Sequence, residues 1–182
     1  ASHIIGSEVA GAAVFAGSVI REISCRGGIF SGDDVSAAVR ARNPKSPCSR
    51  LVEVEQTNNR GGGSVWPLEA ILSVTEAARA HDLALHMDGA RISNAAAALD
   101  LPLRAFTRDA GVDVLSFGGT KNGAMLGEAI VVMDPAASDG LIYLRKLNMQ
   151  LASKMRFVSA QLVALLSDDL YLRNARHANA MA

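Results

Sequence analysis

Apolar residues gather in short runs along the chain, and polar or glycine-rich stretches separate these runs. The pattern predicts strands at residues 51–55, 83–87, 112–117 and 129–133, and we expect those at 83–87 and 112–117 to be buried. Apolar positions at helical spacing predict helices at residues 32–42, 67–80 and 92–109. Strands that alternate with helical stretches favour parallel βαβ units. The pattern therefore predicts an α/β fold with a mostly parallel sheet flanked by helices.

The hydrophobic patterns of the amino-terminal and carboxyl-terminal parts differ from the alternation of strands and helices in the middle of the chain. Residues 6–17 are small and apolar, which predicts a short helix or a buried loop, and residues 18–23 have some strand character. From Asp139 onward the pattern is helical almost to the end, so we expect one long helix followed by another.

Composition narrows the classes of protein that fit. The chain has 182 residues, 49% of them apolar, which suffices for one domain with a core. Its 18 basic and 18 acidic residues cancel and form no basic block, which argues against nucleic acid or an anionic membrane as a partner. No apolar run is long enough to span a bilayer. Cys25 and Cys48 lack metal-site spacing; we expect free thiols in a cytoplasmic protein, with a disulfide as the open alternative.

Two charged residues follow predicted strands. Asp88 ends the run at 83–87, and Lys121 follows a glycine turn after the run at 112–117. Ligands of open α/β sheets bind outside the carboxyl ends of strands, so Asp88, the nearby Arg91 and Lys121 should lie on one rim. A lysine in this position can form a Schiff base, and an aspartate can keep a pyridine nitrogen protonated. The set therefore predicts a pyridoxal phosphate site.

Each candidate also has a simpler interpretation. Lys121 could be an exposed lysine beside a turn, Asp88 could cap the helix that follows it, and Arg91 could form a surface ion pair. Residues 61–63 are all glycine and predict a plain turn rather than an anion-binding loop. His86 is expected to pack or to hydrogen-bond within its strand, without a chemical role.

The motifs resemble those of a known family. Asp88-Gly-Ala-Arg91 followed by Ser116-Phe-Gly-Gly-Thr-Lys121 is similar to the low-specificity threonine aldolases, which are fold-type-I pyridoxal phosphate enzymes. Residues 3–11 and the loop at 55–63 extend the resemblance. It implies that residues 1–137 form part of an aminotransferase-like cofactor-binding domain, and that residues 138–182 form a helical connection toward a small domain.

The resemblance implies that five residues form the cofactor site. Lys121 is expected to form the Schiff base and Asp88 to bind the ring nitrogen. His3 is expected to stack on the ring and to act in catalysis, while Ala90 and Thr120 complete the cofactor site. No metal is implied.

The resemblance also assigns the substrate, an amino acid. Arg91 should bind its carboxylate, a task that suits a planar bidentate donor, and Asn58 should lie near its hydroxyl. The family has a histidine where Asn58 stands, and an amide cannot act as a base near neutral pH. The base would then be His3, a bound water or the cofactor phosphate.

The implied reaction is retro-aldol cleavage of L-threonine or L-allo-threonine to glycine and acetaldehyde. Two alternatives stay open: a β-eliminating lyase with the same cofactor, or a non-catalytic half that binds a partner through its sheet edge and long helix. The family's members are longer than this chain, so we expect a fragment without the main phosphate loop and the small domain. A homodimer or homotetramer is expected by resemblance, with Lys146 or Arg156 reaching a neighbour's cofactor.

Overall fold

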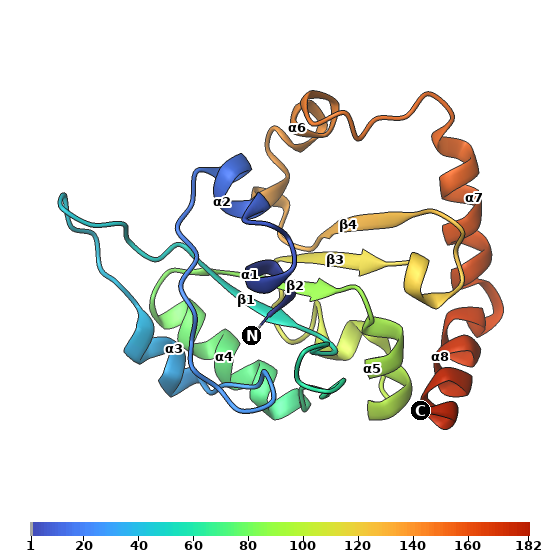
Figure 1. Cartoon of the computed structure of the whole chain (residues 1–182), viewed down its shortest axis with the longest axis horizontal. Helices are drawn as coiled ribbons and strands as arrows, with labels where there is room; N and C mark the ends of the chain where they lie inside the picture. Colours follow the sequence, from blue (N-terminus) through green and yellow to red (C-terminus); the bar gives the residue numbers. More distant parts are fainter. Residues whose placement is uncertain (1) are drawn as a thin grey trace.

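A four-stranded sheet forms the centre of the computed structural model, which describes residues 2–182 (Figure 1). Its strands lie in the order β1-β2-β3-β4, with bounds Leu51–Glu55, Ala84–Gly89, Val114–Gly118 and Glu128–Val132. β1 pairs with β2 and β2 with β3 in parallel, whereas β4 runs antiparallel to β3. The expected mostly parallel sheet is confirmed, and its strands fall close to the predicted runs.

The direction of β4 follows from the length of its connection. β1 and β2 are joined through α4 (Leu68–Ala80), and β2 and β3 through α5 (Ile92–Leu99), so each pair has a helix that crosses back over the sheet. The stretch between β3 and β4 contains only the short 3₁₀ helix η2 (Thr120–Asn122). Such a connection can return the chain only antiparallel. The predicted βαβ alternation therefore stops at β3.

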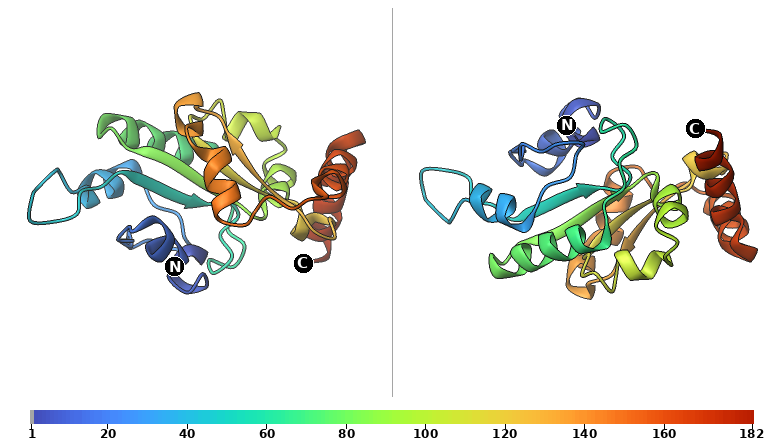
Figure 2. Two further views of the ribbon diagram at one scale, coloured as in Figure 1. Left: turned by 90° about the horizontal axis from the view of Figure 1, so that it is seen from above. Right: turned by 90° about the horizontal axis from the view of Figure 1, so that it is seen from below.

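One face of the sheet is apolar and packs against helices. Figure 2 shows α4 and α5 on this face and the first two helices of the chain, α1 (His3–Gly6) and α2 (Gly11–Ala16), on the other. Strand residues that point toward the helices are buried, and they form one core with residues of α4, α5 and the loops. The core residues with the largest buried side chains are Val35, Val54, Trp66, Ile71, Val74, Leu85, Met87, Ile92 and Phe106.

The amino-terminal segment is less regular than expected. It contains α1 (His3–Gly6), α2 (Gly11–Ala16) and α3 (Gly32–Ala38). The strand character of residues 18–23 is not realised, because this segment has no hydrogen-bonded strand beside it in the described part of the chain.

The boundaries of α3 have local causes. It begins in a capping box, in which Ser31 and Asp34 each bond the other's backbone N–H. It ends at Ala38 rather than near residue 42. Arg40 instead exchanges two hydrogen bonds of 3.0 Å with Ser49, one from each backbone N–H, which draws the chain into a loop.

Left-handed residues divide the predicted long helices. α5 ends at Leu99, where Asp100 has φ 50°, and η1 (Leu103–Phe106) follows it. In the carboxyl-terminal part, Asp168 and Asp169 have φ of 51° and 55°, which no regular helix accommodates. The predicted helical character of the carboxyl-terminal part is confirmed, but this part is divided into more pieces than the expected pair of helices. The segment holds η3 (Pro135–Ser138), α6 (Leu141–Leu147), α7 (Met155–Leu166), η4 (Ser167–Asp169) and α8 (Leu170–Met181).

The last helix returns to the main body of the fold. α8 packs along α5, and Asn94 and Asn179 join the two helices through a pair of hydrogen bonds. No helix within residues 2–182 combines the length and the apolar character needed to cross a bilayer.

Candidate active site

The face of the sheet opposite α4 and α5 carries polar side chains in register. Because side chains alternate along a strand, Glu55 of β1, Asp88 of β2 and Ser116 of β3 form one row across this face. Glu53 and His86 form the next row toward the amino ends of the strands. The strands thus present acids at their carboxyl ends, on the side that the helices leave uncovered.

Asp88 lies where a ligand could reach it. Its Oδ1 atom accepts a hydrogen bond of 2.9 Å from the backbone N–H of Ala90, while Oδ2 accepts none from residues 2–182. The interpretation as a helix cap is wrong, since Arg91 holds the N-cap position of α5 and no side chain caps that helix. The half-buried carboxylate of Asp88 therefore keeps one oxygen available.

A close backbone contact holds the Asp88 turn beside the strand that leads to Lys121. A Cβ atom on Gly118 would lie 2.4 Å from the carbonyl oxygen of Ala90 and 2.6 Å from its Cα. Real Cβ atoms do not approach so closely, so only glycine fits here. The carboxyl ends of β2 and β3 are thereby kept together, as the sequence predicts.

Lys121 lies in η2, three residues beyond the end of β3, and is exposed. It lines a pocket of about 430 Å³ with Asn94 of α5 and with Arg173 and His177 of α8. In the described part of the chain its side chain has no hydrogen bond or ion pair. Thr120, beside it, is exposed, and its backbone N–H donates to the Glu128 carboxylate over 3.2 Å.

His3 lies at the carboxyl end of β1. Its backbone N–H donates to the buried Glu55 carboxylate over 3.0 Å. Its ring atom Nδ1 lies 2.5 Å from Glu8 Oε1, and its side chain is 28% exposed. Because Glu55 is the register partner of Asp88, His3 comes close to the strand end that carries the predicted ring-nitrogen ligand.

The loop after β1 is organised by Glu55 and Asn58, both buried. Glu55 accepts hydrogen bonds of 3.1 Å from Asn58 Nδ2 and from the backbone N–H of Asn59. Asn58 Oδ1 accepts a bond of 2.6 Å from the N–H of Gly61. The amide of Asn58 is therefore committed in part to the loop, and its role toward a substrate hydroxyl stays a prediction.

Sequence reasoning missed the importance of the two glutamates of β1. The signal was present, because Leu51-Val-Glu-Val-Glu55 alternates and places Glu53 and Glu55 on one face, opposite Val52 and Val54. Arg91 was named, and the structure leaves its half-buried side chain without a hydrogen bond or ion pair in residues 2–182. The surface ion pair considered for it is thus not formed there.

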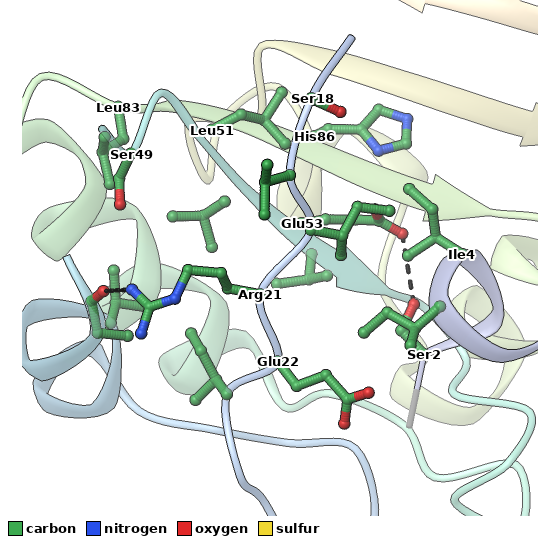
Figure 3. A pocket seen from close by; sticks show the side chains of 18 of the residues that line it. Ser2, Ile4, Ser18, Arg21, Glu22, Ser49, Leu51, Glu53, Leu83 and His86 are labelled. Carbon is green, nitrogen blue, oxygen red and sulfur yellow. Dashed lines mark hydrogen bonds between the residues drawn. The ribbon is translucent and has the colours of Figure 1, made fainter. Parts of the chain in front are cut away.

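A cavity of about 1080 Å³ opens beside the polar face. Figure 3 shows it between the segment that carries Ser18, Arg21 and Glu22 and the sheet residues Glu53 and His86. Ser2 Oγ donates to Glu53 Oε1 over 3.4 Å at one side. His86 Nε2 bonds Ser116 Oγ over 3.0 Å, so its hydrogen bond joins β2 to the neighbouring strand β3 rather than lying within its own strand as predicted.

Burial changes the acidity of two of the groups that face this cavity, Glu53 and His86. It raises the pKa of Glu53 from its ordinary 4.5 to about 7, and the nearby charge of Asp88 adds to the effect. Burial also lowers the pKa of His86, although the charge of Asp88 opposes this. Both side chains therefore tend toward their neutral forms.

Glu53→Gln should stabilise the protein above pH 7. A raised carboxyl pKa means that the folded state binds more protons than the unfolded state between pH 4.5 and 7, so stability falls as pH rises through this window. The variant lacks this penalty, which amounts to about 3 kcal/mol at most. Urea unfolding at pH 4 and pH 8 measures the difference in unfolding free energy between the variant and the wild type. Glu22→Gln, which replaces an exposed acid beside the same cavity, is the control. An equal effect of Glu53→Gln at both pH values would contradict this account.

The chain as a whole has relatives among known proteins. The sequence of the whole chain, residues 1–182, matches the family described as beta-eliminating lyase. The chain belongs to the beta-eliminating lyase family. It is 42% identical over 142 residues to a low-specificity L-threonine aldolase of Pseudomonas sp. (strain NCIMB 10558), which covers 78% of this chain and 40% of that protein. A low-specificity L-threonine aldolase of Escherichia coli (strain K12) is 33% identical over 130 residues, covering 69% and 38%.

One solved structure supports the same family, and a second shows the shared fold. A threonine aldolase from Leishmania major superposes with a TM-score of 0.90 at 26% identity, over 99% of this chain and 52% of that chain. A structure described as a putative L-allo-threonine aldolase from Listeria monocytogenes has a TM-score of 0.72 at 20% identity, covering 97% and 46%, and shows the shared fold alone. The chain thus spans roughly half or less of the length of the family members it matches.

Proposed function

We propose that the polypeptide carrying this chain cleaves L-threonine or L-allo-threonine to glycine and acetaldehyde with pyridoxal phosphate. The observation that carries the proposal is the contact of Gly118 with Ala90, which keeps the Asp88 turn and the Lys121 strand end side by side. The names of the family relatives support the same reaction.

The residues present fit the cofactor. A protonated pyridine nitrogen needs a carboxylate acceptor, and Oδ2 of the half-buried Asp88 accepts no other hydrogen bond from residues 2–182. Asp88, Lys121 and His3 would hold the ring, with Ala90 and Thr120 beside it. When bound, pyridoxal phosphate supplies an electron sink for the pair released as the Cα–Cβ bond breaks.

The chain's own groups account for binding and orientation. With the cofactor bound, Asp88 would keep a proton on the ring nitrogen, and the amine of Lys121 would be the group that attaches the cofactor covalently. Arg91, which is unpaired in the described residues, is free to bind the substrate carboxylate through two parallel N–H bonds. Fixing the carboxylate also fixes which bond to Cα breaks.

His3 is the group best placed to take the proton of the substrate hydroxyl. Glu8 lies at Nδ1 of its ring, so an N–H at that atom leaves Nε2 as the acceptor. Asn58 cannot compete for this role, because an amide is no base and its atoms already bond Glu55 and Gly61. Acetaldehyde then leaves as the hydroxyl loses its proton to Nε2.

A product assay tests the proposal. The complete natural polypeptide, incubated with pyridoxal phosphate and L-threonine, should release acetaldehyde and glycine in equal amounts. The family's description favours β-elimination as the second candidate, which would instead give a 2-oxo acid and ammonia from its substrate. Absence of acetaldehyde from both L-threonine and L-allo-threonine would reject the aldolase assignment.

The proposal extends to assembly and location. Exposed apolar side chains on α6 (Ile142, Tyr143, Leu144 and Leu147) support a homodimer or homotetramer, in which Lys146 could reach a neighbour's cofactor. Cys25 and Cys48 are free thiols, as expected, and support a cytoplasmic location.

A further inference from the structure

The turn that carries Lys121 is fastened to α8 by two amide hydrogen bonds. Asn122 Nδ2 donates to the backbone oxygen of Tyr171 over 3.0 Å, and Asn174 Nδ2 donates to the backbone oxygen of Asn122 over 2.7 Å. Asn122 is only 7% exposed, and both bonds are partly buried. We call this pair the Asn122–Asn174 clamp. In Figure 1 the short turn after β3 lies against the start of α8.

The clamp adds an external restraint to a turn that has little of its own. The backbone N–H groups of Asn122 and Ala124 both donate to the oxygen of Gly119, over 3.0 and 3.1 Å. A three-residue 3₁₀ helix with such bonds frays easily. Gly123 has φ 113°, and a Cβ atom there would lie 3.0 Å from Asn174 Nδ2, so α8 packs closely on the turn.

The side chain of Lys121 is exposed and makes no hydrogen bond within residues 2–182. The position of its Cα atom is therefore set by the backbone of the turn, and the Asn122–Asn174 clamp fixes the peptide that follows it. A flexible lysine side chain reaches a bound cofactor in productive geometry only if the backbone that carries it is fixed. Misplacement of a reacting group by 1 Å can lower the rate about a hundredfold.

We propose that Asn174 is a positioning residue for Lys121, an inference that rests on the proposed function. By fixing the Asn122 peptide, Asn174 presents Nζ of Lys121 to the aldehyde carbon of pyridoxal phosphate. The nitrogen, as the neutral amine, would form a double bond to that carbon in place of the aldehyde oxygen, which would leave as water with the two protons of the amine. Asn174 itself touches neither the cofactor nor the substrate; it acts through the backbone of Asn122.

The chain offers a matched control on the same helix. Asn179 Nδ2 donates to the backbone oxygen of Asn94 over 3.0 Å, and Asn94 Nδ2 donates back to Asn179 Oδ1 over 2.8 Å. Asn179→Leu therefore removes an amide contact between α8 and the main body without touching the turn of Lys121. Asn174→Leu removes the bond to that turn.

The experiment follows attachment of the cofactor rather than turnover. Pyridoxal phosphate is added to the complete cofactor-free protein, borohydride stops the reaction at set times, and mass spectrometry measures the pyridoxyl adduct on Lys121. Asn174→Leu should form the adduct about tenfold more slowly than the wild type, whereas Asn179→Leu should match the wild type. Circular dichroism establishes that all variants are folded at the temperature used.

A second variant covers the case in which Asn174→Leu does not fold. Asn174→Asp keeps the shape of the side chain but places an oxygen against the oxygen of Asn122, so it should slow the adduct similarly. Equal rates for the wild type, Asn179→Leu and a folded Asn174 variant would overturn the inference and leave the proposed function intact. A wild-type protein that forms no adduct on Lys121 would overturn both.

Discussion

Lys121→Ala in the complete polypeptide should abolish the covalent attachment of pyridoxal phosphate and the release of acetaldehyde. Alanine has no amine to attach the cofactor, and loss of a covalent catalytic group costs a factor on the order of a thousand or more in turnover. Visible absorbance with added cofactor and a coupled acetaldehyde assay measure the two effects. Both should fall to background together.

Two further variants make this result specific. Lys121→Arg keeps the positive charge but cannot attach the cofactor, so it should behave like Lys121→Ala. Lys45→Ala removes an exposed lysine from the loop between α3 and β1 and should leave both signals unchanged. Wild-type absorbance and turnover in Lys121→Ala would remove Lys121 from the site.

Gly118→Ala should give the largest loss of stability among single methyl additions to a glycine of the sheet. The new Cβ atom would meet backbone atoms of Ala90 at 2.4 to 2.7 Å, and backbone cannot rotate away as a side chain can. Overpacking of this kind costs about 3 kcal/mol or more. The strand end that leads to Lys121 should separate from the Asp88 turn, so cofactor binding should weaken as well.

Urea unfolding of Gly118→Ala is compared with Gly11→Ala. Gly11 lies in α2 with no atom near its would-be Cβ, so its substitution should be neutral or slightly stabilising. If the two variants unfold at the same urea concentration, the contact with Ala90 does not constrain the sheet.

The sequence was informative wherever a local pattern decides the structure. The runs around Leu85 and Leu115 form strands as predicted, although mainly their alternate residues are fully buried, and the helix after Pro67 begins and ends as its pattern predicts. Asp88 lies at a strand end and Lys121 just beyond the neighbouring one, because the position of a residue after a parallel strand determines the rim to which it belongs.

Features that depend on distant contacts could not be predicted. The two aspartates at 168 and 169 break a helical pattern without glycine or proline, so no local signal marks the end of α7. Asn58 was expected near the substrate, and its bonds to Glu55 and Gly61 emerge only when the loop closes. The clamp between Asn122 and Asn174 joins residues 52 positions apart.

The two-sided character of β2 limits how this chain can vary. Leu85 and Met87 face the core while His86 and Asp88 face the open side, and the two sets interleave residue by residue. Deleting one residue within this strand would rotate every later side chain to the other face, sending the acid into the apolar layer and a methionine outward. Homologues and designed variants should therefore tolerate length changes in the flanking loops and never a single-residue indel within the strand.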